Sequence, residues 1–400
     1  MRLGSFKEYH WKSEGKNVEA GEVILDGGLL RTPEERMKTS KAMVLEGPGR
    51  MVLKEFPLPE IGPEEGLLKV EMVGVCSSDV GMYRGKATRA PRPYPIIMGH
   101  EIYGTIAQIG EQVSKRHNIK EGDRAIVEYT FGCGKCFYCM KGEYIHCESL
   151  FTYGSMISCK EPPHLWGAYS EFLYLPLRAM VHKVKDNLLP EVGVLICAVL
   201  GNAIRWLRMI GGISLGDTVV IQGPGQQGLA GVIVAKEASA GKIMITGLTK
   251  DRGRFELAKA FGADEIIDVE KMDPVETVRK STNGRMADIV MDVTGTPKGA
   301  ITAIDSVKKK GTVILPGLYG MDKEIPLILD KIVYKEVRVQ GVFSHDFRSV
   351  IPAIHLAESG KYPFEKMVTH RYPLKEAEKA VRVAGGEIKG EDPIKVVIVP

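Results

Sequence analysis

Four cysteines lie within fifteen positions of the chain: Cys133, Cys136, Cys139 and Cys147. The first three are spaced three residues apart, so all four thiols can converge on one point, the tetrahedral all-sulfur arrangement of a structural zinc site. Two disulfides are the alternative, but a chain with no secretory signal at its start is expected to be cytoplasmic, where thiols stay reduced. The spacing therefore predicts a zinc-binding lobe over residues 130–150.

Three glycines follow a predicted strand over residues 217–222 and open a predicted helix that runs to about residue 240. In a dinucleotide-binding fold, Gly223 would make the turn, Gly225 would let the backbone approach the pyrophosphate, and Gly228 would seat the helix on the sheet. An unrelated glycine-rich turn is the alternative, and the strand-to-helix context argues against it.

The second strand of this region ends without the acidic residue that usually binds the adenosine ribose hydroxyls. Gly247 stands there, and basic side chains follow at Lys250, Arg252 and Arg254. Because no carboxylate at this position repels a 2′-phosphate, the sequence slightly favours NADP over NAD. Solvated charges at a helix start are the alternative interpretation of the basic residues.

A second set of metal-binding side chains is spread along the sequence. Cys76 lies in a loop after an apolar strand, His100 lies in another loop, and Cys197 precedes the nucleotide-binding region. Two thiolates and one imidazole leave zinc one open position for water or a substrate oxygen, as in a catalytic site. Taken singly, each cysteine is read as a small buried residue. Their occurrence together with the four-cysteine lobe and the glycine motif favours a catalytic metal.

The fold class that we predict is α/β plus all-β. Alternating strands and helices over residues 199–342 indicate a doubly wound parallel sheet, with strands at 217–222, 242–246, 265–268, 287–293, 312–315 and 336–340. Short apolar runs over residues 41–198 indicate a β-barrel or sandwich, with strands at 42–45, 67–73, 102–109 and 124–128 and no long helix from 66 to 128. Residues 343–400 are expected to return to this domain through a strand at 395–399, and residues 1–40 form a polar extension.

The charge balance gives no sign of a nucleic-acid partner. Lys and Arg total 54 against 50 Asp and Glu, and the basic residues are scattered along the chain. The longest apolar run, residues 192–204, is too short to cross a bilayer. We therefore expect no membrane partner.

Together these motifs resemble those of the zinc-containing medium-chain alcohol dehydrogenase family, from about Lys41 to the C-terminus. The resemblance is carried by residues 74–79 (Gly-Val-Cys-Ser-Ser-Asp), 99–101 (Gly-His-Glu), 122–124 (Gly-Asp-Arg), the four-cysteine lobe, 167–172 (Gly-Ala-Tyr-Ser-Glu-Phe) and 223–228 (Gly-Pro-Gly-Gln-Gln-Gly). It implies a Rossmann domain with a GroES-like barrel, two zinc ions per chain, NAD(P), and a homodimer or homotetramer. It also implies hydride transfer between the nicotinamide and a small-molecule alcohol or carbonyl.

The resemblance further assigns roles to single residues. The implied ligands of the catalytic zinc are Cys76, His100 and Cys197. Glu101 would lie beside this metal and enter its coordination shell when water or substrate exchanges. Asp79 would orient the histidine ligand, and Ser78 would contact the alcohol and begin a proton relay.

Three positions depart from the family pattern. Gly81 stands where many relatives carry the histidine that forms the outer member of the relay, so the proton needs another route, such as the cofactor ribose or ordered water. Polyol-specific relatives place a glutamate near Ala198; we choose the adjoining Cys197, because alanine cannot bind metal. Cys159 has no partner in this scheme and is expected to be a free thiol.

Two other functions are alternatives. A zinc-independent, quinone-reductase-like NADP oxidoreductase would bind one zinc per chain instead of two. A zinc-ribbon nucleic-acid-binding protein would show a salt-sensitive gel shift.

Overall fold

The computed structural model describes residues 39–86, 92–320 and 324–400. The expected N-terminal extension lies outside these residues except for its last two, Thr39 and Ser40. These two begin the first strand, β1 (Thr39–Gly47).

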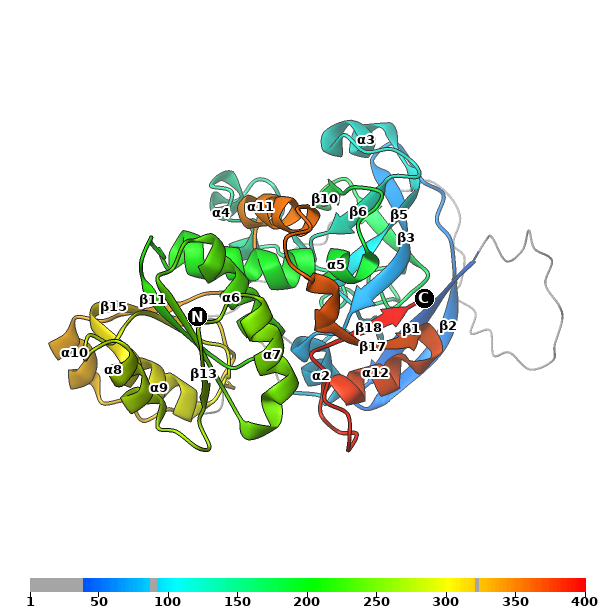
Figure 1. Cartoon of the computed structure of the whole chain (residues 1–400). Helices are drawn as coiled ribbons and strands as arrows, with labels where there is room; N and C mark the ends of the chain where they lie inside the picture. Colours follow the sequence, from blue (N-terminus) through cyan, green and yellow to red (C-terminus); the bar gives the residue numbers. More distant parts are fainter. Residues whose placement is uncertain (1–38, 87–91, 321–323) are drawn as a thin grey trace, which may run out of the picture. The chain divides into compact units, whose positions relative to one another are not determined.

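A mainly antiparallel β structure, drawn largely in blue and cyan in Figure 1, is formed by the first part of the chain and two C-terminal strands, which pair parallel with each other. One sheet has the order β10-β6-β5-β3-β18-β17, with β9 also paired to β3, and a smaller sheet has the order β2-β1-β4. Its strands are β2 (Arg50–Pro57), β3 (Glu65–Gly74), β4 (Ile96–Ile97), β5 (Glu101–Ile109), β6 (Arg124–Val127), β9 (Phe172–Pro176), β10 (Val181–Lys183), β17 (Val368–Pro373) and β18 (Lys395–Val399). Strand β18 pairs antiparallel with β3, so the last strand returns to the first sheet, as the sequence predicted.

Two short helices interrupt this region, α2 (Ser77–Tyr83) and α3 (Glu111–His117). Helix α2 places Ser78 and Asp79 on its first turn, where the sequence analysis expected a loop. The reason is local: the Asp79 carboxylate accepts a hydrogen bond from the Cys76 backbone N–H at 2.9 Å and so caps the start of the helix.

The four-cysteine lobe leaves the sheet through a two-stranded pair, β7 (Thr130–Phe131) and β8 (Phe151–Thr152). Between these strands lie α4 (Phe137–Met140) and the 3₁₀ turn η1 (Tyr144–His146). The lobe therefore consists of short turns anchored on one pair of strands.

The nucleotide-binding region is a six-stranded sheet of order β13-β12-β11-β14-β15-β16 in which every pair is parallel. Its strands are β11 (Thr218–Gln222), β12 (Lys242–Gly247), β13 (Glu265–Asp268), β14 (Ala287–Asp292), β15 (Val307–Leu315) and β16 (Arg338–Gly341). Its helices are α6 (Gln226–Glu237), α7 (Arg252–Ala260), α8 (Pro274–Ser281), α9 (Pro297–Ser306) and α10 (Leu329–Lys335), with the short turn η4 (Thr249–Asp251) before α7. The predicted doubly wound sheet is confirmed, and its strand order reverses on either side of β11.

One helical segment joins the two regions. It comprises α5 (Pro190–Leu195) and two π-helical stretches, η2 (Ile196–Gly201) and η3 (Ile204–Ile210). The whole segment, Pro190–Ile210, has 21 residues and is long and apolar enough to cross a membrane by length and composition. The expectation that the apolar run at residues 192–204 is too short for this is therefore wrong. However, 83% of its apolar window is buried within the protein, and Leu195, Leu200 and Leu207 belong to the central core.

Residues 343–400 contain helices that the sequence analysis did not place. These are α11 (Phe347–Glu358), α12 (Ala377–Ala384) and the 3₁₀ turns η5 (Phe364–Met367) and η6 (Leu374–Glu376). Helix α11 packs against η2, and α12 packs against β18 and α2. The C-terminal part of the chain therefore contacts both the joining segment and the helix that carries Ser78.

Candidate active site

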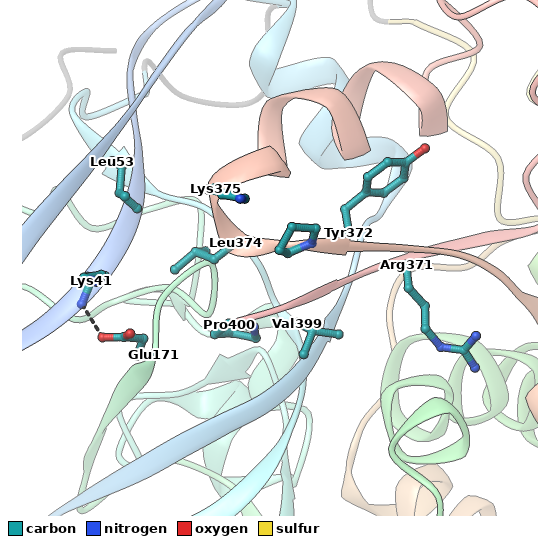
Figure 2. A pocket seen from close by; sticks show the side chains of 10 residues that line it. Lys41, Leu53, Glu171, Arg371, Tyr372, Leu374, Lys375, Val399 and Pro400 are labelled. Carbon is teal, nitrogen blue, oxygen red and sulfur yellow. Dashed lines mark hydrogen bonds between the residues drawn. The ribbon is translucent and has the colours of Figure 1, made fainter.

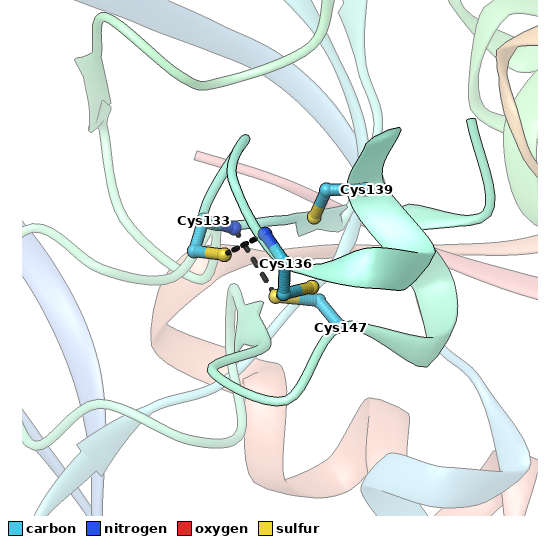
Figure 3. Close-up of side chains that lie close together, drawn as sticks. All are labelled: Cys133, Cys136, Cys139 and Cys147. Carbon is cyan, nitrogen blue, oxygen red and sulfur yellow. Dashed lines mark hydrogen bonds between the residues drawn. The ribbon is translucent and has the colours of Figure 1, made fainter. Parts of the chain in front are cut away.

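The four cysteines of the lobe surround one point (Figure 3). Their sulfur atoms all lie within 4.8 Å of one another, and all four thiols are free. The backbone N–H groups of Cys133 and Ser149 donate to Cys147 Sγ at 3.2 and 3.3 Å. The N–H of Cys139 contributes most to lowering the pKa of the Cys136 thiol to about 6. Such donors favour the thiolate form, which binds metal; at Cys147 burial outweighs them and raises the thiol pKa to about 12.

This lobe fits a zinc ion in size and in ligand type. Four sulfurs bound to zinc at about 2.3 Å lie roughly 3.8 Å apart, and Cys136 Sγ and Cys147 Sγ are 3.8 Å apart. Gly132 leaves space for the four sulfur atoms, because a Cβ at this position would stand 2.4 Å from Cys139 Sγ. Gly134 has a φ of +75°, a conformation that other residues rarely adopt. The structure thus brings together the four residues that the spacing singled out.

Replacing Cys136 with Ser is expected to lower the zinc content by about one ion per chain, because a serine hydroxyl is not ionised at neutral pH and binds zinc poorly. Elemental analysis of the purified protein measures this. Cys159→Ser is the matched control, since Cys159 is a free cysteine outside the lobe. An unchanged zinc content in Cys136→Ser would contradict a metal in the lobe.

The second candidate metal site gathers Cys76, Ser78, Asp79 and His100 around the start of α2. His100 Nε2 lies 3.3 Å from Ser78 Oγ, whereas His100 Nδ1 lies 3.3 Å from Asp79 Oδ1, without the alignment of a hydrogen bond. Tyr169 donates to Asp79 Oδ2 at 3.1 Å and holds the carboxylate in place. A carboxylate beside one imidazole nitrogen leaves the other as the ligand atom, as is usual for metal-binding histidines.

The electrostatics of this cluster favour a thiolate at Cys76. Burial alone would raise the pKa of the Asp79 carboxyl and of the Cys76 thiol, and would lower that of His100. The contacts outweigh burial: His100 lowers the pKa of both acids below their usual values, and Asp79 raises the pKa of His100 well above its usual value. Without a metal these contacts favour a thiolate at Cys76 beside a protonated His100, and a zinc ion bound here would take the place of that proton.

Glu101 lies next to this cluster and is held by a buried lysine that sequence reasoning missed. The side chains of Glu101 and Lys395 are both 0% exposed, and Lys395 Nζ donates to Glu101 Oε2. Lys395 Nζ also donates to the Val75 carbonyl at 3.2 Å. Gly74 has no room for a side chain, because a Cβ there would meet the Glu101 carboxylate. Since 294 residues separate the pair, no local spacing pointed to it.

Cys197 lies in the π-helical stretch η2 and is 3% exposed. Burial raises the pKa of its thiol well above the usual value, and the charges of Glu128 and Glu101 raise it further. Among the described residues, the only group of three or more possible metal ligands with atoms within 4.8 Å of one another is the four-cysteine lobe. The structure thus brings Cys76 and His100 together and does not bring Cys197 within 4.8 Å of both. Its role as third ligand stays a prediction.

Tyr129 and His345 also line this region, although no sequence pattern indicated them. The Tyr129 ring packs with its edge on His100 and on His345, with ring centroids 5.3 and 5.0 Å apart. His345 is fully buried, and its Nδ1 lies 3.3 Å from Asn202 Oδ1. The segment before α11 therefore reaches the candidate site through His345.

The glycines of the nucleotide motif have the expected geometry. Gly223 has a φ of +102°, and a Cβ at Gly228 would stand 1.9 Å from the Gly223 carbonyl oxygen. A Cβ at Gly225 would meet no atom within 4 Å, so open space lies before the N-terminus of α6. An open, glycine-lined helix N-terminus is what a pyrophosphate requires.

At the end of β12, Gly247 is buried and Lys250 is exposed on the following turn. Arg254, one of the three basic residues behind the expectation of NADP, donates to Asp251 at 3.0 Å and to Asp392 at 2.6 Å. Its charge is therefore already compensated within the protein.

A surface hollow of about 640 Å³ lies apart from these residues (Figure 2). It is lined by Leu53 of β2, Tyr372 of β17, Leu374 of η6, Val399 of β18 and other residues near them in space. None of the candidate metal-binding or nucleotide-binding residues lines it, so we do not include it in the candidate active site.

Two comparisons of sequence bear on this geometry. Residues 62–186 match the alcohol dehydrogenase GroES-like domain family, and residues 228–359 match the zinc-binding dehydrogenase family. The chain is 38% identical over 365 residues to a probable alcohol dehydrogenase of Mycobacterium tuberculosis, covering 90% of this chain and 98% of the relative. It is 33% identical over 358 residues to a sorbitol dehydrogenase of Halalkalibacterium halodurans, covering 88% and 97%.

Solved structures show the same architecture. An alcohol dehydrogenase of Thermotoga maritima superimposes with a TM-score of 0.82 at 27% identity, covering 90% of this chain and 99% of the other. A Sinorhizobium meliloti protein assigned as a zinc-binding dehydrogenase and solved with NADP superimposes with a TM-score of 0.79 at 25% identity, with the same coverage. With the fold, the glycine motif and the cysteine lobe, these matches show that the chain belongs to the zinc-containing medium-chain alcohol dehydrogenase family.

Proposed function

We propose that this alcohol dehydrogenase exchanges a hydride between a small alcohol or carbonyl and NAD(P), and that it depends on two zinc ions per chain. The observation that carries the proposal is the cluster in which Cys76 and Ser78 face His100 while Asp79 lies on the other side of the imidazole. This cluster provides metal ligands and a hydroxyl for the substrate in one place. The four-cysteine lobe supports a second, structural zinc.

Each residue of the cluster has a separate task. Cys76 and His100 Nε2 would hold the catalytic zinc, which when bound would act as a Lewis acid on the substrate oxygen. Asp79 fixes the imidazole so that Nε2 faces the metal. Ser78 Oγ, 3.3 Å from Nε2, is placed to take the alcohol proton while it passes its own proton on to the cofactor ribose or to ordered water. A Cβ at Gly81 would meet no atom within 4 Å, so open space replaces the side chain that continues the relay in many relatives.

The function is tested by a screen of alcohols and carbonyls with NAD(H) and NADP(H), read by the absorbance of the reduced nicotinamide. Polyols belong in the screen, because a relative is a sorbitol dehydrogenase. Elemental analysis of the same preparation should give two zinc ions per chain. One zinc ion, retained after Cys76→Ala, would favour the zinc-independent reductase instead.

The chain also has features of a self-associating protein. Strand β16 is the last strand in the order of its sheet, and the helix that precedes it in the chain, α10, packs on β15 and exposes Leu329, Val333 and Tyr334 by 66%, 67% and 82%. Apolar side chains gathered beside a sheet edge are typical of an interface. We propose that two copies associate through this edge.

Replacing Val333 with Asp is expected to convert the oligomer to a monomer, because a carboxylate buried between two copies without a partner is costly. Light scattering after size-exclusion chromatography measures the mass. Met156→Asp is the control, since Met156 is 45% exposed and lies outside α10 and β16. An unchanged mass for Val333→Asp would exclude this edge as the interface.

A further inference from the structure

The acid that the second strand lacks stands on the neighbouring strand. Gly247, the last residue of β12, is the register partner of Asp268, the last residue of β13. Parallel neighbours lie about 4.8 Å apart, so the Asp268 carboxylate occupies the same edge of the sheet, one strand away. This edge is where the adenosine ribose lies in a dinucleotide-binding sheet.

Gly247 itself cannot carry a carboxylate. A Cβ at this position would stand 2.7 Å from the Phe255 ring and 2.7 Å from the Pro224 ring, both of which are rigid groups. The packing of α7 and of the glycine turn thus fills the space that an acidic side chain at the end of β12 would need. An acidic group must therefore come from another element.

Asp268 faces the turn that follows β12. Thr249 Oγ1 donates to Asp268 Oδ2 at 2.8 Å and lies 3.0 Å from Oδ1, and the Thr249 N–H donates to Glu270 Oε2 at 2.8 Å. Asp268 is 9% exposed and pairs on its other side with Lys271 Nζ at 2.8 Å. Two carboxylates therefore flank Thr249, the second residue after the strand.

We propose that Asp268, acting with Thr249, replaces the missing acid of β12 and makes the site select NAD over NADP. The inference rests on the proposed function, since it assumes that a nicotinamide dinucleotide binds at this edge. The proposal is the opposite of the preference for NADP that the basic residues suggested. One of these residues, Arg254, is already paired with Asp251 and Asp392, so its charge is not free to attract a 2′-phosphate.

The selection follows from charge. A ribose 2′-hydroxyl can donate a hydrogen bond to a carboxylate or to the Thr249 hydroxyl. A 2′-phosphate carries close to two negative charges at neutral pH and has no such donor. Placed beside Asp268 and Glu270, it would be repelled by both. The cations nearby are Lys250, Arg252 and Lys271, the partner of Asp268; all three are exposed, so their attraction is weakened by high-dielectric solvent.

Calorimetric titration of the purified enzyme with NAD and with NADP tests the inference without relying on turnover. We expect the unmodified protein to bind NAD at least about tenfold more tightly than NADP. Asp268→Asn, which keeps a hydrogen-bond acceptor for Thr249, should tighten NADP binding several-fold and change NAD binding less. Glu270→Gln should also tighten NADP binding, but by less. Because it alters only an exposed side chain, it provides the test if Asp268→Asn fails to fold.

Asp305→Asn is the matched control. It also removes one carboxylate from the nucleotide-binding region, but Asp305 pairs with Lys331 away from β12 and β13, so the ratio of the two affinities should stay unchanged. Equal or tighter binding of NADP by the unmodified protein would overturn this inference alone. An unchanged ratio in both Asp268→Asn and Glu270→Gln would also overturn it. Binding of neither dinucleotide would overturn it together with the proposed function.

Discussion

Cys76→Ala and His100→Ala are each expected to lower turnover by at least about a thousandfold, because each would remove a ligand of the proposed catalytic zinc, whose Lewis acidity would supply several kcal/mol to the reaction. Binding of the dinucleotide should not change. The glycine motif lies in the turn after β11 and in the first turn of α6, whereas Cys76 precedes α2 and His100 precedes β5. Turnover assays and calorimetric titration of each variant with the dinucleotide measure the two effects separately.

Cys159→Ala is the control for this experiment. Cys159 is a buried free thiol outside both candidate metal sites, and burial raises its pKa to about 11. Its replacement should keep turnover within about twofold of the unmodified enzyme, a change of a few tenths of a kcal/mol in the barrier. Unchanged turnover in Cys76→Ala would show that the reaction does not use this cluster.

The same series examines the third ligand. If Cys197 completes the catalytic site, Cys197→Ala should lose the same zinc ion as Cys76→Ala, and the double variant should lose no more than either single one. If Cys197 is only a buried residue of η2, its replacement should keep both zinc ions. Elemental analysis distinguishes the two results, and turnover alone does not, because a cavity in the core segment could also lower activity.

The parts of the site that the sequence predicted are those fixed by local spacing. The four cysteines converge because they lie on consecutive short turns between β7 and β8. Gly223 and Gly228 are identifiable because the first has a φ of +102° in the turn and a Cβ at the second would stand 1.9 Å from the Gly223 carbonyl oxygen. In both cases the physical constraint acts between residues that are close together in the sequence, so a sequence motif reveals it.

The remaining parts depend on contacts between distant segments. Lys395 and Glu101 are separated by 294 residues, and each alone reads as an ordinary charged residue. Likewise, the basic residues after β12 favoured NADP, whereas the proposed selection of NAD rests on contacts that place Asp392 against Arg254 and Asp268 against Thr249. Sequence alone shows which charges exist but not which of them are already paired.

The buried pair also gives the second large prediction. Lys395→Met should destabilise the protein by about 3–5 kcal/mol, because it leaves the carboxylate of Glu101 buried without a counter-charge. Methionine has a similar length and volume, so little of the effect should come from a cavity. The shift in the denaturant midpoint, monitored by tryptophan fluorescence, measures the loss.

The double variant Glu101→Gln with Lys395→Met separates charge from packing. Replacing both members of a buried ion pair with neutral groups of similar shape is often neutral or stabilising, so the double variant should recover most of the stability lost in Lys395→Met. Lys389→Met, at an exposed position, is the control and should change stability by less than about 0.5 kcal/mol. If the double variant is as unstable as Lys395→Met, then the hydrogen bond from Lys395 to the Val75 carbonyl, rather than compensation of Glu101, is what the lysine contributes. In that case the buried carboxylate of Glu101 would not need the charge of Lys395. The ion pair between the two residues would then not explain why a lysine is buried beside the candidate metal site.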